Sequence, residues 1–237
     1  MKDYRHLLIE DWDQEKLDNT TVLLAGAGAV GSQTAIALAR LGVKTIVVDS
    51  DVLEEHNLGN QAYSRRHLGL SKVDALKSIV KEISDVEFIA IKSLIENLKF
   101  DNYKIDVLLG ALDNIGARYY LNAVAVFSGK PYIDAGIEGY AGSVRTILPH
   151  INSCMQCWPS IIKERKVRPS CSQDPIPSVC ITAGHASNFQ VMQLLNFLFG
   201  KEVSSFITFD LQRGIANPIN LNRNKECELC GTIPSTG

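Results

Sequence analysis

Three glycines that follow an apolar run carry the first chemical signal in this sequence. The run Thr21–Ala25 is typical of a buried strand, and Gly26-x-Gly28-x-x-Gly31 comes directly after it. In such a turn the first glycine permits a sharp bend, the second leaves room for a phosphate, and the third allows close packing of helix and strand. Asp49 ends the next strand about 20 residues further on, where an acidic side chain commonly binds ribose hydroxyls. These residues predict a nucleotide site, without separating NAD from ATP.

A lysine and an aspartate further along favour a triphosphate with its metal ion. Lys72 opens a predicted helix, and Asp113-Asn114 follows the apolar strand 107–112, where open α/β sheets bind ligands. A lysine neutralises phosphate charge and a carboxylate anchors Mg²⁺. Each residue also has an ordinary interpretation, Lys72 as a solvated lysine and Asp113 as a helix N-cap. Other polar side chains follow the second strand: Asp51, Asn57, Asn60, Gln61, Arg65 and Arg66.

Two Cys-x-x-Cys pairs, Cys154/Cys157 and Cys227/Cys230, have the spacing of zinc ligands. The alternatives are that the pairs are unrelated, or that one is a redox dithiol, although neither begins a helix in a thioredoxin-like unit. Four thiolates leave zinc no open position for a substrate, so the metal would stabilise the fold. We therefore expect a structural zinc that ties the C-terminal tail to a loop in the middle of the chain.

The composition limits the class of protein. Among 237 residues, 24 Lys and Arg stand against 26 Asp and Glu, a net charge of −2, which gives no electrostatic case for nucleic acid or an anionic membrane. Apolar residues make up 46%, and no apolar run is long enough to span a bilayer. The N-terminus has no apolar signal core, so a cytoplasmic protein is expected.

Strands and helices alternate along most of the chain, which predicts a doubly wound, mostly parallel sheet of the Rossmann-like α/β class. Strands are expected at 21–25, 44–49, 86–91, 106–109, 131–136 and 142–148, and helices at 32–41, 70–83, 114–127 and 186–199. Late, antiparallel strands are expected at 205–211 and 218–221. The cysteine- and proline-rich stretch 149–180 is predicted to be an irregular crossover loop, and 227–231 a zinc-clamped tail. We expect residues 1–237 to form one domain.

Taken in order, these stretches resemble the superfamily of ubiquitin-activating enzymes and their bacterial relatives, the ThiF, MoeB and HesA adenylyltransferases. The resemblance covers essentially the whole chain and keeps the order of the motifs. The matching stretches are Gly26–Gly31, Val48–Asp51, Asn57–Gln61, Gly69–Lys72, Leu112–Asn114 and the two cysteine pairs, with a looser match at Tyr4-Arg5-His6.

The resemblance implies a homodimer that uses Mg-ATP to adenylate the C-terminal glycine of a ubiquitin-like or sulfur-carrier protein ending in Gly-Gly. It implies the following roles: the glycine turn with Asp51 and Asn114 beside the ATP, Asp49 on the ribose, Asn57 and Lys72 on the phosphates, Asp113 on Mg²⁺, and Arg5 reaching the γ-phosphate from the partner subunit. Because the leaving pyrophosphate gathers negative charge, fixed cations would do most of the catalysis. The attacking carboxylate is already ionised at pH 7.

Two residues need separate treatment. Asn60 stands where the family usually has an arginine, and a neutral amide does not replace a guanidinium. Either Arg65 or Arg66 supplies that charge, or phosphate stabilisation is weaker. Cys171, in the crossover loop, resembles the cysteine that becomes a thioester or persulfide carrier after adenylation in several members. A thiolate attacks an acyl-adenylate readily. Cys171 is otherwise a loop cysteine without a role.

Three other functions remain open from the sequence. An NAD-dependent dehydrogenase explains the glycine turn and Asp49 equally well, but leaves Asp113 and the cysteine pairs unused. A non-catalytic nucleotide-binding scaffold is favoured if Asn60 removes a needed charge. A third alternative stays within the family and adenylates a small-molecule or tRNA-linked carboxylate.

Overall fold

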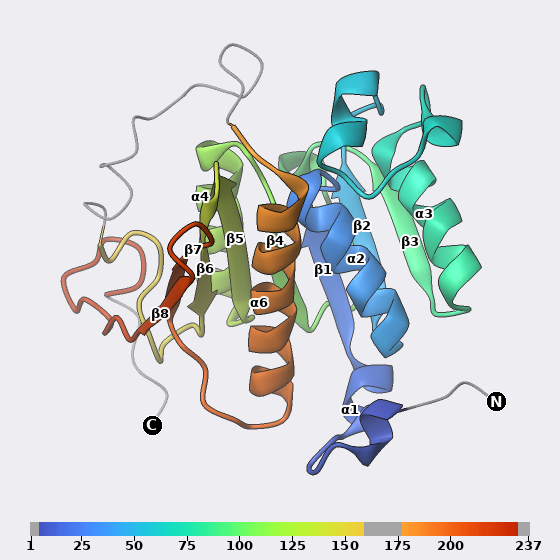
Figure 1. Cartoon of the computed structure of the whole chain (residues 1–237). Coiled ribbons are helices and arrows are strands. Elements are labelled where there is room, and N and C mark those ends of the chain that lie inside the picture. Colours follow the sequence, from blue (N-terminus) through green and yellow to red (C-terminus); the bar gives the residue numbers. More distant parts are fainter. Residues whose placement is uncertain (1–4, 159–176, 232–237) are drawn as a thin grey trace.

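An eight-stranded sheet runs through the protein in a computed structural model that describes residues 5–158 and 177–231 (Figure 1). Its order is β3-β2-β1-β4-β5-β6-β7-β8. The first five strands of this order are parallel, and the rest pair antiparallel, as the sequence predicts. The strands are β1 Thr21–Ala25, β2 Lys44–Asp49, β3 Phe88–Lys92, β4 Val107–Gly110, β5 Tyr132–Glu138, β6 Ala141–Ile147, β7 Phe206–Asp210 and β8 Ile215–Ile219.

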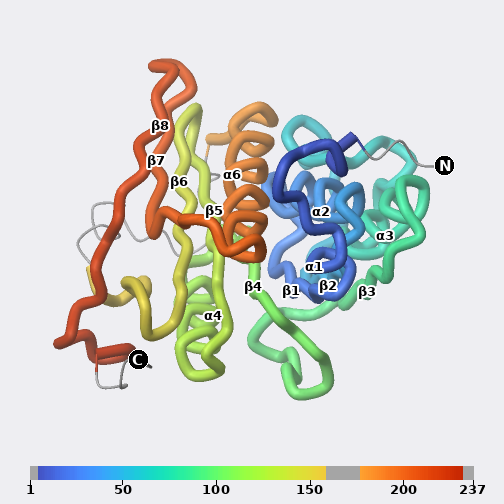
Figure 2. Tube along the Cα trace, turned by 90° about the horizontal axis from the view of Figure 1, so that it is seen from below, coloured from blue at the N-terminus to red at the C-terminus, as the bar shows by residue number. Residues whose placement is uncertain are grey.

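Helices cover both faces of the sheet, which makes three layers (Figure 2). The helices α2, α3 and α6 pack on one face, and α4 packs on the other with the cysteine-bearing segments. The α-helices of the described residues are α1 Gln14–Asn19, α2 Ala29–Leu41, α3 Lys72–Ile83, α4 Ile115–Ser128 and α6 Cys180–Leu198. Short 3₁₀ helices lie at Arg5–Leu8, Glu55–Gly59, Arg65–His67, Ile95–Asn97 and Phe100–Asn102. Within the described residues, no helix combines the length and apolar character needed to cross a bilayer.

Local sequence sets the ends of the helices that lead to the site. The Ser71 hydroxyl accepts from the amide of Asp74 and so caps α3, and the Asn114 side chain accepts from Gly116 and caps α4. Gly42 ends α2 in the left-handed conformation that glycine adopts without strain. The buried strand β1 and its neighbour β4 then hold the starts of α2 and α4 at one edge of the sheet.

Three boundaries differ by three residues or more from those expected from the sequence. Helix α2 begins at Ala29, directly after the glycine turn, and β8 begins at Ile215. Helix α6 begins at Cys180, before the expected start at residue 186, so the crossover loop ends one residue earlier than expected. Cys180 itself is exposed. The early start follows from tertiary packing, because Thr182 and Ala183 are fully buried and override the weak helix propensity around Gly184.

The far edge of the sheet is formed by β8, whose five residues are all exposed. It contains Pro218, which lacks a backbone N–H and is tolerated in a sheet mainly at an edge. This edge lies beyond the antiparallel strands, away from β1 and β4.

Candidate nucleotide site and metal centre

The strand order creates one natural ligand site. Strand β1 has β2 on one side and β4 on the other, which is the point where the order of the parallel strands reverses. Ligands of open α/β sheets bind outside the carboxyl ends of the strands at such a point. The glycine turn after β1, Asp49 at the end of β2 and Asp113 after β4 all lie at this edge. The structure therefore brings together residues that are far apart in sequence.

The glycines of the turn have the three different environments that the sequence predicts. A Cβ on Gly31 would lie 1.9 Å from the carbonyl oxygen of Gly26, and a Cβ on Gly26 would lie 2.4 Å from that of Ala111. These two positions therefore require glycine for packing. Gly28, the N-cap of α2, has nothing within 4 Å of its virtual Cβ, so its backbone is open to an approaching group.

Asp49 is already hydrogen-bonded at both carboxylate oxygens. Its Oδ2 accepts from the amide of Ala27 at 2.7 Å, and its Oδ1 accepts from that of Asp51 at 2.8 Å. Burial raises the pKa of Asp49 above its ordinary value, while the positive charge of Lys72 and these two amides oppose the rise. The carboxylate thus fixes the glycine turn to the end of β2, where a ribose would bind.

Lys72 is a buried cation at the same edge. Its side chain is 9% exposed, and its Nζ lies 2.7 Å from Oδ2 of Asp51, whose side chain is 60% exposed. The Tyr63 hydroxyl donates to the carbonyl of Ala27 at 2.7 Å and lies 3.2 Å from that of Lys72. This tyrosine therefore joins the start of α3 to the glycine turn. Lys72 is thus not the solvated lysine of the ordinary interpretation.

Asp113 is exposed after β4, and the neighbouring Asn114, rather than Asp113, caps α4. In the described part of the chain, the Asp113 carboxylate has no hydrogen bond or ion pair. Because no described residue engages it, this carboxylate can offer oxygen ligands to a cation such as Mg²⁺. The helix-cap interpretation of Asp113 is therefore wrong, and its predicted chemical role stays a prediction.

Asn57 and Asn60 lie in the segment after β2. The side chain of Asn57 accepts from the amide of Glu54 at 2.9 Å and forms a capping box. The Asn60 amide instead donates to the hydroxyl of Ser178 at 2.7 Å, at the end of the crossover loop. The amide of Ala62 donates to the Ser32 hydroxyl, which ties this segment to α2.

Neither neighbouring arginine takes the place of the missing guanidinium. Arg66 forms a bidentate pair with Glu82 on α3, at 2.7 and 2.9 Å, and Arg65 lies 3.5 Å from Glu55. Both arginine side chains are largely exposed. The interpretation in which one of them supplies the charge finds no support in this conformation.

Arg5 lies apart from the other candidate residues. It begins the 3₁₀ helix that precedes α1, at the opposite end of the molecule from the carboxyl ends of the strands (Figure 1). This segment is held by Trp12, whose ring lies 4.8 Å from that of His6 and 5.5 Å from that of Phe199. Within one chain, Arg5 does not meet Lys72 or Asp113.

Sequence reasoning missed a buried polar group beside Asp113. Arg118, in the first turns of α4, forms an ion pair with Asp134, which is 1% exposed and also accepts from the Tyr132 hydroxyl at 2.9 Å. An acidic residue inside the apolar strand 132–135 was the available signal. Gln61 was also left without a role, although its buried Oε1 has no hydrogen-bond partner among residues 5–158 and 177–231.

The four cysteines of the two Cys-x-x-Cys pairs form a compact, buried cluster. Their sulfur atoms all lie within 4.8 Å of one another, with the Cys154 sulfur 3.6 Å from that of Cys227 and the Cys157 sulfur 3.3 Å from that of Cys230. A tetrahedral zinc with Zn–S bonds of about 2.3 Å holds its sulfurs about 3.8 Å apart. The cluster therefore fits zinc. Cys171, the candidate acyl acceptor, lies outside the described residues.

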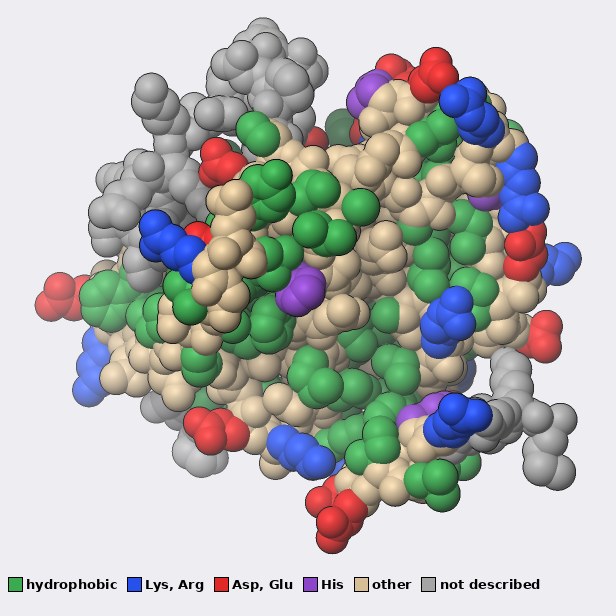
Figure 3. Space-filling model, viewed as in Figure 1, with side chains coloured by type: hydrophobic (Ala, Val, Ile, Leu, Met, Phe, Trp, Pro, Cys, Tyr) green, Lys and Arg blue, Asp and Glu red, His purple; other side chains and the backbone are tan. Residues whose placement is uncertain are grey.

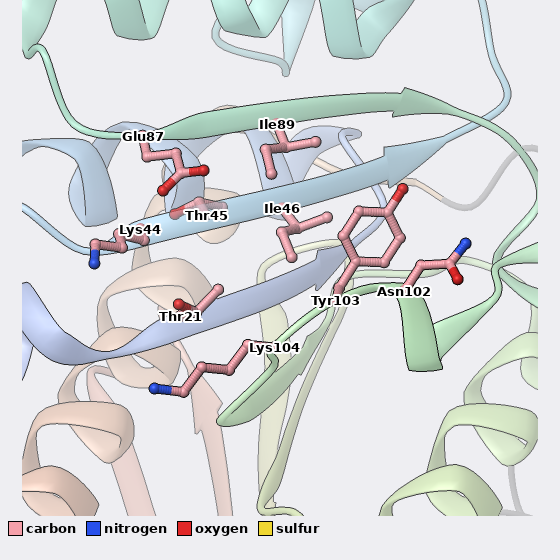
Figure 4. A pocket seen from close by; sticks show the side chains of 9 residues that line it. All are labelled: Thr21, Lys44, Thr45, Ile46, Glu87, Ile89, Asn102, Tyr103 and Lys104. Atoms are coloured by element: carbon pink, nitrogen blue, oxygen red, sulfur yellow. The ribbon is translucent and has the colours of Figure 1, made fainter.

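A hollow of about 330 Å³ opens elsewhere, at the amino ends of β1 and β2 (Figure 4). The side chains of Lys44, Lys104, Glu87 and Tyr103 lie around it. It is at the opposite edge of the sheet from the glycine turn, so it is not part of the candidate nucleotide site.

These features define a nucleotide-binding α/β protein: the strand order, the glycine turn and Asp49 at the end of β2. The chain belongs to the ThiF family, whose model matches residues 3–229. The family resemblance drawn from the sequence motifs is thereby confirmed.

Relatives with similar sequences are named as an adenylyltransferase/sulfurtransferase and a modifier-activating enzyme. The chain is 35% identical over 146 residues to the probable adenylyltransferase/sulfurtransferase MoeZ of Mycobacterium tuberculosis, covering 58% of this chain and 37% of that protein. It is 27% identical over 238 residues to ubiquitin-like modifier-activating enzyme 5 of Dictyostelium discoideum, covering 90% of this chain and 62% of that protein. The chain thus spans less than two thirds of the length of either relative.

A solved structure of E. coli MccB with ATP has the same fold. Its TM-score is 0.77 at 21% sequence identity, and the match covers 92% of this chain and 68% of that one.

Proposed function

We propose that this protein is an ATP-dependent adenylyltransferase that activates the C-terminal glycine carboxylate of a ubiquitin-like or sulfur-carrier protein. The 237 residues would form one adenylation domain. The observation that carries the proposal is the meeting of an open Gly28, a buried Lys72 and an unengaged Asp113 at the switch point of the sheet. A dehydrogenase has no use for the last two residues.

The geometry suits the stages of the reaction. The backbone at Gly28 and the N-terminus of α2 accept the phosphates, and Asp49 accepts hydroxyls of the ribose. Lys72 stabilises charge that develops on the pyrophosphate, and Asp113 holds Mg²⁺. The carboxylate of the carrier attacks the α-phosphate, an acyl-adenylate forms, and pyrophosphate leaves. The described residues supply no general base, and an ionised carboxylate needs none.

Pyrophosphate exchange tests this proposal directly. Labelled pyrophosphate should enter ATP only when Mg²⁺ and a carrier ending in Gly-Gly are both present. A carrier that lacks its last glycine is the matched control and should give no exchange. Exchange with a free small carboxylate in place of the carrier would instead favour the alternative substrate class, and tight NAD binding without ATP binding would favour a dehydrogenase.

We propose zinc as the ligand of the cysteine cluster because four buried sulfurs at these distances match a closed tetrahedral site. A closed site has structural consequences only, since zinc is left no position for substrate. The metal would link the segment after β6 to the segment near the C-terminus. One equivalent of zinc per chain, measured by elemental analysis of the purified protein, is expected.

We propose that Cys171 accepts the acyl group after adenylation. The thiolate sulfur bonds to the carbonyl carbon, AMP leaves with the electron pair, and a thioester results. The variant Cys171→Ala should keep pyrophosphate exchange and lose a thiol-labile carrier adduct on non-reducing gels. Loss of both would place the cysteine in the adenylation step instead, and retention of the adduct would exclude Cys171.

We propose that the enzyme acts as a homodimer. The 3₁₀ helix that begins at Arg5 lies at the opposite end of the molecule from the carboxyl ends of the strands, so the proposed role of Arg5 requires a second copy. The outer surface of α6 presents Ile181 and Met192, which are 57% and 51% exposed, and hydrophobic side chains gather around this helix (Figure 3). This surface is the candidate subunit interface.

A further inference from the structure

Arg145 is a buried cation that the described residues leave unsatisfied. Its side chain lies on β6 and is 4% exposed, and its Nη1 has no hydrogen-bond partner. Its guanidinium carbon lies 4.9 Å from the centre of the Phe206 ring, which supports the group without hydrogen bonds. A buried guanidinium without an anion is costly, so this group requires a partner.

The adjacent aspartate does not fill that requirement. Asp134 faces Arg145 across the β5–β6 pair, but Arg118 occupies both of its carboxylate oxygens and Tyr132 donates to one of them. Arg118, whose side chain is 18% exposed, and the buried Arg145 therefore face one carboxylate, which pairs with Arg118. Among the described residues, the charge of Arg145 stays without a paired carboxylate on the face of the sheet that α4 covers.

The cysteine cluster lies on that same face. Ile147, two residues after Arg145 and hence on the same side of β6, packs in one apolar cluster with Cys154 and Cys157. The amide of Met155, between these cysteines, donates to the Asn122 side chain of α4. Burial lowers the pKa of Arg145, and the charge of Arg118 adds to this effect, while Asp134 and then Cys154 oppose it.

We propose that Arg145 is the buried counter-cation of the metal-loaded cysteine cluster, and that metal affinity depends on its charge. Four thiolates with one Zn²⁺ carry a formal charge of −2, which is as costly to bury alone as the guanidinium. A second cation is present, since Arg223 donates to the carbonyl of Cys230. Arg145 is therefore a positioning residue for the metal, not one of its ligands.

The inference rests on the zinc of the proposed function. It predicts that one substitution changes the melting temperature differently in the metal-free and the zinc-loaded protein. In the metal-free protein the described residues leave Arg145 as an unpaired buried charge, so Arg145→Met should leave the melting temperature unchanged or raise it. In the zinc-loaded protein the same substitution removes a paired charge and should lower the melting temperature. A merely structural arginine would produce a loss in both states.

Zinc competition against a chromophoric chelator measures the affinity itself. Substitution of groups that surround a metal site typically costs 10- to 100-fold in affinity, and we expect a loss of about that size for Arg145→Met. Arg145→Lys, which keeps the charge, should restore most of it. Lys104→Met, which removes an exposed positive charge at another edge, is the matched control and should change nothing.

Unchanged zinc affinity in Arg145→Met would overturn the inference, whatever happens to the melting temperature. Unchanged affinity with a raised KM for the carrier would assign Arg145 to substrate binding instead. If the wild-type chain binds no zinc, the inference fails together with the proposed metal. Pyrophosphate exchange would still test the adenylyl chemistry independently, because the metal has no part in that step.

Discussion

At the scale of single residues, two polar side chains of the candidate site, Lys72 and Asp49, are engaged before any nucleotide arrives. Lys72 is paired with Asp51, and Asp49 is bonded to two backbone amides. The Asp51 side chain is 60% exposed, whereas that of Lys72 is 9% exposed. A phosphate that approaches from the solvent side can therefore replace Asp51 as the partner of Lys72.

The substitutions Lys72→Ala and Asp113→Ala should each lower carrier-dependent pyrophosphate exchange strongly. Removing one group that stabilises transition-state charge costs roughly 10²- to 10³-fold in rate. Lys77→Ala, on the exposed side of the same helix as Lys72, is the control and should retain full activity. A loss below tenfold in both variants would contradict the assigned roles.

Asn60 and Ser178 should behave as one unit. Because their side chains are hydrogen-bonded to each other, Asn60→Ala and Ser178→Ala should each lower the free energy of unfolding by about 1 kcal/mol. The double variant should lose little more than either single one, and the KM for ATP should stay within about twofold of wild type. If Asn60 contacts phosphate instead, only Asn60→Ala will raise the KM for ATP.

At the scale of elements, two glycines of the same turn have different roles: Gly31 is needed for packing, and Gly28 for binding. Gly31→Ala forces a Cβ against the carbonyl of Gly26, so we expect a loss of about 1–3 kcal/mol or more in unfolding free energy, measured with urea. Gly28→Ala meets open space and has an ordinary φ of −78°, so it should fold normally. It should nevertheless weaken ATP binding in calorimetry, because the new methyl group occupies the approach to the backbone.

Equal destabilisation by both substitutions would contradict that separation. So would unchanged ATP affinity in Gly28→Ala, since it would place the nucleotide away from the turn.

Most of these elements could be predicted from the sequence because local signals and burial agree there. Strand β1, the turn and Asp49 follow from apolar runs, glycine spacing and one acidic residue. The start of α6 could not be predicted, since packing of Thr182 overrides the local preference around Gly184. Long-range pairs such as Asn60 with Ser178 leave no periodic trace in the sequence, and neither does the ion pair of Arg118 with Asp134.

At the scale of the whole molecule, two copies should complement each other. If Arg5 acts across a dimer, Arg5→Ala and Lys72→Ala should each be inactive alone in pyrophosphate exchange. Mixed and allowed to exchange subunits, they form hybrids with one intact site, and the activity should recover to about a quarter of wild type. No recovery, although light scattering shows a dimer, would mean that Arg5 does not act across the interface.

The outermost strand β8 has a consequence for behaviour at high protein concentration. Its residues are exposed, and an uninterrupted ladder of free amides and carbonyls there would invite strands of other molecules to attach and propagate into aggregates. Pro218 interrupts that template because it supplies no donor. Replacing Pro218 with valine would restore a backbone donor at this edge and allow other molecules to attach to it. The resulting aggregation would be measured as turbidity before any change in enzyme activity.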